Sequence, residues 1–222
     1  MNYRNHLRAA LCVIISMNML ACEESTEPAA EEETFGDGKV ATAIDLGLSV
    51  DWAEWNIGGE MPADFGLYFQ WGATSTDGSY YDAIGEANFG TEHDAAHVRW
   101  GDGWRMPTTD EIRELVNDAN CTWEWTTQTN SHGSEVNGYL VTSKKEGYTQ
   151  NSIFLPASGE TGWSSKIGTT GFLWSGSAAS IIDKDGTAVV YGIDFIEDYH
   201  VTSSYTREHR FPIRPVRERN AD

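Results

Sequence analysis

After residue 38, short apolar and aromatic runs alternate with clusters of Gly, Asn, Asp, Ser and Thr along the chain. Turn-forming clusters at this spacing divide the chain into segments that suit β-strands. All 9 Trp residues lie between positions 52 and 174, where they supply large apolar surfaces for a core. A chain of 222 residues is long enough for one good core and short for two. We therefore predict a single β-rich domain over residues 40–222.

The apolar runs predict individual strands. In the run around position 124, Trp123 and Trp125 share one face and Glu124 points the other way, which is typical of a half-buried strand. Core packing is the expected role of both indole rings. The complete set of predicted strands is 49–57, 66–71, 122–127, 138–142, 152–155, 172–175, 188–195, 199–205 and 212–216.

Two short helices are predicted between these strands. Thr108 and Glu111 have capping-box spacing, which begins a helix. Ile112, Leu115 and Val116 follow on one apolar face, and Asn120 is the expected end. A second helix is predicted at 93–98. Helices and antiparallel strands together give an α+β fold class, with two short helices, small sheets and long loops.

The charge of the chain limits its partners. It carries 34 Asp and Glu residues against 15 Lys and Arg, a formal net charge of -19. Such a surface repels phosphate backbones and anionic lipid headgroups. We therefore expect no nucleic-acid partner and favour ligands that are neutral or cationic.

Residues 1–21 have the parts of a secretory signal peptide: basic residues at the start, an apolar stretch, and small residues before the expected cut. A lasting membrane span needs about 20 apolar residues, more than this stretch has. Residues 19–22 resemble a bacterial lipobox, so Cys22 is the predicted lipidation site and membrane anchor. The alternative is an ordinary cleaved signal that happens to precede a cysteine.

Residues 22–39 are acidic, poor in hydrophobic residues and interrupted by Pro28, so we expect a disordered tether. Acidic residues directly after the lipidated cysteine also resemble the surface-export signal of Bacteroidetes lipoproteins. This resemblance implies a lipid-anchored protein of the outer membrane, exposed at the cell surface. A spacer without a sorting role is the alternative.

A distinctive series of short segments runs through residues 40–222: 45–58, 65–72, 94–101, 103–108, 151–157, 173–177 and 213–217. Together they resemble the Fibrobacter succinogenes major paralogous domain, a family common in Bacteroidetes surface lipoproteins. The resemblance implies a C-type-lectin-like fold, related to that of the formylglycine-generating enzyme. It does not settle function, because binding sites differ among proteins of one fold.

The fold that the resemblance implies raises the possibility of calcium-dependent sugar binding. Calcium-dependent lectins of this fold carry Glu-Pro-Asn or Gln-Pro-Asp in a loop and Trp-Asn-Asp on the next strand. Neither motif is present, and the corresponding strand reads Trp174-Ser175-Gly176-Ser177. Asp183 and Asp185 suit a hairpin turn better than a calcium loop. His93 and His97 have helical spacing but lack the Glu of a metalloprotease motif. We predict no metal and no cofactor.

Catalytic motifs are likewise missing from the sequence. The formylglycine-generating relatives use a pair of cysteines, whereas Cys121 alone remains after the signal peptide and the lipidation site. We expect Cys121 to be a small buried residue. Arg105, just before the helix cap, is interpreted as structural, and Arg214 and Arg217 are expected to pair with acidic groups. The protein is predicted not to be an enzyme.

Exposed aromatic residues in loops are the candidate ligand-binding residues. Trp163 lies within loop 157–171, which is rich in small polar residues, and Tyr80 and Tyr81 lie in a second loop. The alternative for Trp163 is a ring that folds back onto the core.

The function predicted from these features is a non-enzymatic, lipid-anchored binding or adhesion module for an extracellular glycan or protein. The alternative function is a structural or assembly subunit of a surface appendage or outer-membrane complex.

Overall fold

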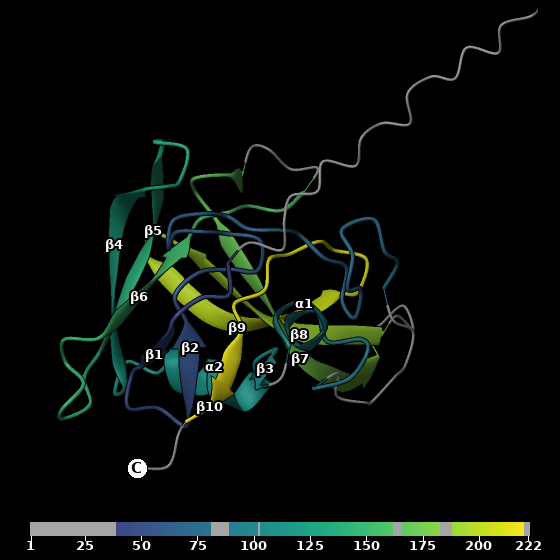
Figure 1. Cartoon of the computed structure of the whole chain (residues 1–222), viewed down its shortest axis with the longest axis horizontal. Coiled ribbons are helices and arrows are strands. Elements are labelled where there is room, and N and C mark those ends of the chain that lie inside the picture. The colour runs from purple at the N-terminus through teal and green to yellow at the C-terminus, as the bar shows by residue number, and fades with distance from the viewer. Residues whose placement is uncertain (1–38, 81–88, 102, 162–165, 183–187, 220–222) are drawn as a thin grey trace, which may run out of the picture. The chain divides into compact units, whose positions relative to one another are not determined.

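The computed structural model describes residues 39–80, 89–101, 103–161, 166–182 and 188–219 (Figure 1). These residues form two short helices and three antiparallel sheets, which confirms the α+β class. None of their helices has the length and apolar character needed to cross a membrane. The helices are α1 (Ala95–Trp100) and α2 (Thr109–Leu115).

The four-stranded sheet has the order β1-β2-β10-β3 and joins the two ends of the described chain. Two three-stranded sheets have the orders β4-β5-β6 and β7-β8-β9. The strands are β1 (Ala43–Asp45), β2 (Val50–Ala53), β3 (Trp104–Arg105), β4 (Cys121–Thr129), β5 (Glu135–Ser143), β6 (Ser152–Pro156), β7 (Gly171–Ile182), β8 (Ala188–Ile196), β9 (Tyr199–Thr206) and β10 (Val216–Glu218).

Most predicted strands are found, but the predictions for segments 66–71 and 212–216 are wrong. Segment 66–71 makes only one isolated bridge, between Phe69 and Phe211. The strand predicted at 212–216 begins only at Val216. Pro212 and Pro215 have no N–H to donate to a ladder. Their carbonyls instead accept the N–H groups of Trp174 and Ala53, at 3.1 and 2.8 Å.

Helix α2 begins as predicted. The Thr108 hydroxyl accepts the Glu111 N–H, and the Glu111 carboxylate accepts the Thr108 N–H, so the capping box is complete. The helix ends at Leu115, earlier than the predicted Asn120. Asn120 still contributes to this end, because its amide donates to the Glu114 carbonyl at 2.8 Å. The Trp123 indole donates to the Leu115 carbonyl at 3.2 Å.

Helix α1 begins two residues later than predicted, because Asp94 is its N-cap. The buried Asp94 carboxylate accepts the N–H groups of Ala96 and His97, at 3.0 and 3.2 Å, and also that of Met106. His93 therefore lies outside the helix, and the expected helical spacing of His93 and His97 does not apply.

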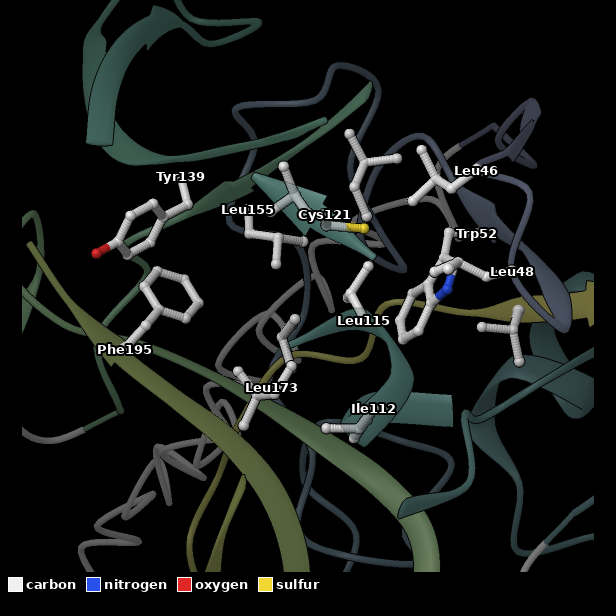
Figure 2. Packing of buried hydrophobic residues seen from close by; sticks show 14 of the residues in the cluster. Leu46, Leu48, Trp52, Ile112, Leu115, Cys121, Tyr139, Leu155, Leu173 and Phe195 are labelled. Carbon is white, nitrogen blue, oxygen red and sulfur yellow. The ribbon is translucent and has the colours of Figure 1, made fainter. Parts of the chain in front are cut away.

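One hydrophobic cluster connects all three sheets and helix α2 (Figure 2). Trp52 and Leu48 lie at one end of the view, and Tyr139 and Phe195 face each other at the other end. Cys121 is fully buried between them, as predicted, and burial raises the pKa of its thiol to about 11. Trp123 and Trp125 pack on the cluster while partly exposed, which confirms a half-buried strand.

A second cluster surrounds Trp71 and Trp174, which are both fully buried. Each indole N–H has a backbone acceptor: Trp71 donates to the Ser175 carbonyl at 2.9 Å and Trp174 to the Phe69 carbonyl at 2.8 Å. These two bonds attach segment 66–71 to strand β7, in place of a ladder.

Arg214 is fully buried, and among the described residues its hydrogen-bond partners are all neutral groups, so the expected pairing with an acidic side chain is not found there. Its guanidinium donates to the Asn56 amide oxygen at 2.7 Å and to the carbonyls of Ala53, Glu54 and Phe154, at 3.1, 2.6 and 2.8 Å. Burial lowers its pKa to about 9, so the group remains charged at neutral pH. Four neutral dipoles replace the water around this charge.

The other two arginines behave as predicted. Arg105 makes a two-pronged bond to the Glu111 carboxylate, at 2.8 and 2.6 Å, and a third bond to Glu218 at 2.7 Å. It therefore joins the start of helix α2 to strand β10. Arg217 lies 3.7 Å from the Asp51 carboxylate.

Replacing Arg214 tests its structural role. We expect Arg214→Met to lower the free energy of unfolding by about 3 kcal/mol or more, because it leaves buried acceptors without donors. Arg214→Lys should also lose stability, since an ammonium group cannot reproduce the planar fork. Urea unfolding followed by Trp fluorescence measures both.

The control is Arg113→Met, because Arg113 forms an exposed pair with Asp110. Its effect should stay below about 0.5 kcal/mol. Similar stabilities for Arg214→Met and Arg113→Met would contradict the role given to Arg214.

Candidate functional site

A cleft with a volume of about 830 Å³ is lined by loop 58–68 and by the turn between strands β4 and β5. Thr76, Thr161 and Arg210 bring three more segments to its wall. Lys39 adds a sixth part of the chain, so six separate parts meet around one opening.

Asp64 joins the first two of these parts. One carboxylate oxygen accepts the N–H and hydroxyl of Ser131, at 2.9 and 2.8 Å. The other accepts the N–H groups of Glu60 and Met61, at 2.8 and 3.0 Å. Burial of the Asp64 carboxyl opposes its ionisation, but these hydrogen bonds outweigh burial and hold its pKa below the ordinary value. Asp64 is therefore a fixed anion that organises the wall.

Two glycines give loop 58–68 its path. Gly58 and Gly66 have φ angles of 81° and 75°, which side chains other than glycine rarely adopt. A Cβ at Gly66 would lie 2.5 Å from the Ile57 carbonyl oxygen. That oxygen accepts the Leu67 N–H at 2.7 Å, so the loop closes on itself directly behind the cleft.

Phe65, Leu67 and Tyr68 form the apolar part of the lining, and each is partly exposed. The Asn56 amide donates to the Phe65 carbonyl at 2.9 Å and fixes the backbone there. The Tyr68 hydroxyl donates to the Ser158 carbonyl at 2.6 Å. Burial raises the pKa of Tyr68 to about 12, so the hydroxyl stays protonated at neutral pH.

The polar part of the lining includes three exposed side chains, Thr76, His132 and Thr161, and the partly exposed Asn130. The Asn130 amide oxygen accepts the backbone N–H groups of His132 and Ser134 and holds the turn that presents His132. Hydroxyl, amide and imidazole groups thus lie around an apolar floor. This combination suits a ligand with both apolar faces and hydroxyl groups.

The charges of the lining are mixed. Lys39 and Glu60 are exposed and lie at the cleft together with Arg210. The Arg210 guanidinium donates to the carbonyls of Thr76 and Gly78, which attaches loop 76–80 to segment 207–211. That segment is joined to 69–71 by backbone bonds, including Trp71 N–H to the Arg207 carbonyl at 3.2 Å.

Of the predicted site residues, Cys22, Trp163 and Tyr81 lie outside the described residues, as does the turn at 183–186. Tyr80 is half-buried and does not line the cleft. Its N–H donates to the Gln70 amide oxygen at 2.9 Å, and the Arg207 guanidinium lies 5.0 Å from its ring centre. The structure therefore does not bring Tyr80 to the cleft, and its role in binding stays a prediction.

Sequence reasoning missed the residues that do line the cleft. Residues 66–68 belong to the strand predicted at 66–71, and the sequence patterns assign no role to His132. Gly58 and Gly66, on either side of Asp64, are the sequence feature that indicates a loop with positive φ angles. No local pattern connects this loop with the turn at 130–132.

Metal ligands do not gather in the part of the chain that the structure describes: no group of three or more His, Cys, Asp or Glu side chains could hold an ion there. His93 lies 3.7 Å from Glu92 instead.

Replacement of Asp64 by Asn tests how the wall is held. The amide would place N–H groups against backbone donors, and we expect a loss of about 2 kcal/mol in unfolding free energy at pH 7. Because the pKa of Asp64 is depressed in the folded state, its stabilisation is present above about pH 3.9 and is lost as the pH falls through the folded-state pKa. The difference between the two proteins should therefore shrink in acid.

Urea unfolding from pH 7 to pH 2.5 measures this difference. Asp110→Asn is the matched control, since Asp110 is exposed and pairs only with the exposed Arg113 in the described contacts. A difference for Asp64→Asn that stays constant in acid would show that the charge of Asp64 is not what holds the wall.

No protein-family model, curated protein or solved structure matches this chain. Its function is therefore argued from the cleft and the sequence patterns.

Proposed function

We propose that the protein is a non-enzymatic, lipid-anchored binding module of the cell surface, and that its cleft recognises an extracellular glycan. The observation that carries this proposal is the lining of the cleft, where Phe65 and Tyr68 lie among exposed hydroxyl, amide and imidazole groups. Sugar rings have apolar faces that pack on aromatic rings and hydroxyl groups that bond to polar side chains. The cleft offers partners for both.

The charge of the protein narrows the class of glycan. A net charge of -19 repels polyanionic chains over a long range. Within the cleft, the cationic Lys39 and Arg210 are balanced by Glu60 and by the fixed anion Asp64. A neutral oligosaccharide is therefore the favoured ligand.

The state of Asp64 argues against its use as a catalytic group. A carboxyl group that acts as a general acid or base must exchange a proton with its substrate. Both oxygens of Asp64 are already occupied by backbone and hydroxyl donors, and these keep the group ionised. We therefore give Asp64 a structural role in the wall and no role in proton transfer.

A C-type-lectin-like fold and membership of the Fibrobacter succinogenes major paralogous domain family belong to this proposal. The resembling segments include residues with structural roles: Arg214 in 213–217, Arg105 in 103–108 and Trp174 in 173–177. The two short helices and small antiparallel sheets are consistent with such a fold.

Screening the protein on a glycan array, with calcium and with chelator, tests the proposed function. We expect binding to neutral glycans, unchanged by chelator, because the cleft lining needs no metal. Thr161→Trp should reduce the signal at least ten-fold by filling the cleft, and His132→Ala should reduce it about five-fold through a lost hydrogen bond. Both positions are exposed, so both variants should fold normally.

Thr122→Trp is the matched control, since Thr122 is exposed on strand β4 and does not line the cleft. Equal binding by Thr161→Trp and Thr122→Trp would place the ligand elsewhere. A blank array would favour the second candidate function, an assembly subunit. Strand β4 supports that candidate, because its nine residues form an edge of the described sheet and can pair with another chain.

The proposed anchor has its own test. Acyl chains on Cys22 would add about 0.8 kcal/mol of membrane affinity per buried methylene. We expect the protein in the membrane fraction of cells and Cys22→Ala in the soluble fraction. Cys121→Ala should remain with the membrane, because that thiol is buried in the core. Membrane-bound Cys22→Ala would refute lipidation at this residue.

A further inference from the structure

A contact between a buried carboxylate and a partly exposed imidazole lies behind the wall of the cleft. Thr161 and Arg210 line the cleft, and the residue preceding each of them, Glu160 and His209, contributes to this pair. The Nδ1 atom of His209 contacts the Oε1 atom of Glu160. The Glu160 side chain is 7% exposed and that of His209 36%. Two parts of the wall that are distant in sequence thus meet through one contact.

The surroundings of the pair contain one more cation and two aromatic rings. Lys166 places its Nζ 3.8 Å from the second oxygen of Glu160. The Phe211 ring stacks on His209 at 5.6 Å between centres, and the Tyr205 ring meets it edge-on at 5.8 Å. Arg210 is adjacent in sequence and is bonded to the carbonyls of Thr76 and Gly78.

Tyr205 donates its hydroxyl to the Asp194 carboxylate. Burial, this hydrogen bond and the nearby charge of Glu160 raise the pKa of Tyr205. Tyr205 therefore remains a neutral donor over the physiological range. Imidazole is the side-chain group whose ordinary pKa lies between pH 5 and pH 8, and His209 brings one into contact with Glu160.

Backbone bonds join the two described parts of segment 157–171, which carries Glu160. Gly159 donates to the Thr170 carbonyl at 2.7 Å, and Gly168 donates to the Ala157 carbonyl at 2.8 Å. These bonds lie within the segment. The contact between Glu160 and His209 joins it to segment 207–211.

We propose that the Glu160–His209 pair ties loop 157–161 to segment 207–211 and that protonation of His209 tightens this tie and, with it, ligand binding in the cleft. The part about ligand binding rests on the proposed function. A protonated imidazole adds charge attraction to its hydrogen bond with a carboxylate. When His209 is neutral, this attraction is lost. Glu160 then keeps its described contact with Lys166, and the wall is held less firmly.

Hydrogen–deuterium exchange tests the tie without any ligand. Wild type, Glu160→Gln and His209→Gln are compared at pH 5.5 and pH 8.0, with rates corrected for intrinsic exchange at each pH. We expect peptides from 157–161 and 207–211 to exchange about five-fold more slowly at pH 5.5 than at pH 8.0 in wild type. Both variants should lose this difference. The control His200→Gln should keep it, because His200 stacks on Trp123, away from the pair.

Glycan-array binding at the same two pH values tests the functional part. Wild type should bind about three-fold or more tightly at pH 5.5, and His209→Gln should not respond to pH. His132 also lines the cleft, so a pH response that disappears in His132→Gln but persists in His209→Gln would overturn the proposal.

The two experiments separate the possible failures. Unchanged exchange in Glu160→Gln and His209→Gln overturns the tie, whatever the array shows. A blank array with altered exchange supports the tie and refutes the glycan function.

Discussion

The buried guanidinium of Arg214 is the interaction on which the rest of the structure depends. It reaches the carbonyl of Ala53 at the end of strand β2, that of Glu54 just after it, and that of Phe154 in strand β6. Strands β2 and β6 belong to two different sheets. A charge in the interior requires polar partners, and unpaired carbonyls there would be equally unfavourable. Arg214 and its acceptors therefore satisfy each other and fix how the closing segment passes between the sheets.

The same interaction extends to the cleft through one side chain. The Asn56 amide oxygen accepts a hydrogen bond from Arg214, and its amide nitrogen donates to the Phe65 carbonyl. The floor of the cleft is thus connected to the centre of the fold in two steps. Asp64, the residue before Phe65, then attaches this floor to the β4–β5 turn. Hydrogen bonds thus connect the buried core to the polar surface site.

Local patterns in the sequence predicted much of the fold. Alternation identified β4 with its half-buried Trp123 and Trp125, and the capping box identified the start of α2. The strand predicted at 212–216 was wrong because the hydrogen-bond partners of this segment are distant in sequence. The apolar residues around Arg214 and the two prolines have the pattern of a strand. The cleft could not be predicted for the same reason. Loop 58–68 is bonded to the turn at 130–132 through Asp64 and Ser131, and this contact leaves no local pattern in the sequence.

The central claim is that the cleft around Phe65, Tyr68 and His132 is where a neutral glycan binds. An NMR titration of the protein with a neutral oligosaccharide that it binds on the array tests this most directly. If the glycan binds in the cleft, the amide chemical shifts of residues 64–68, 130–132 and 161, which surround it, should change. Shift changes confined to strand β4, or spread over the surface without a centre at the cleft, would contradict it.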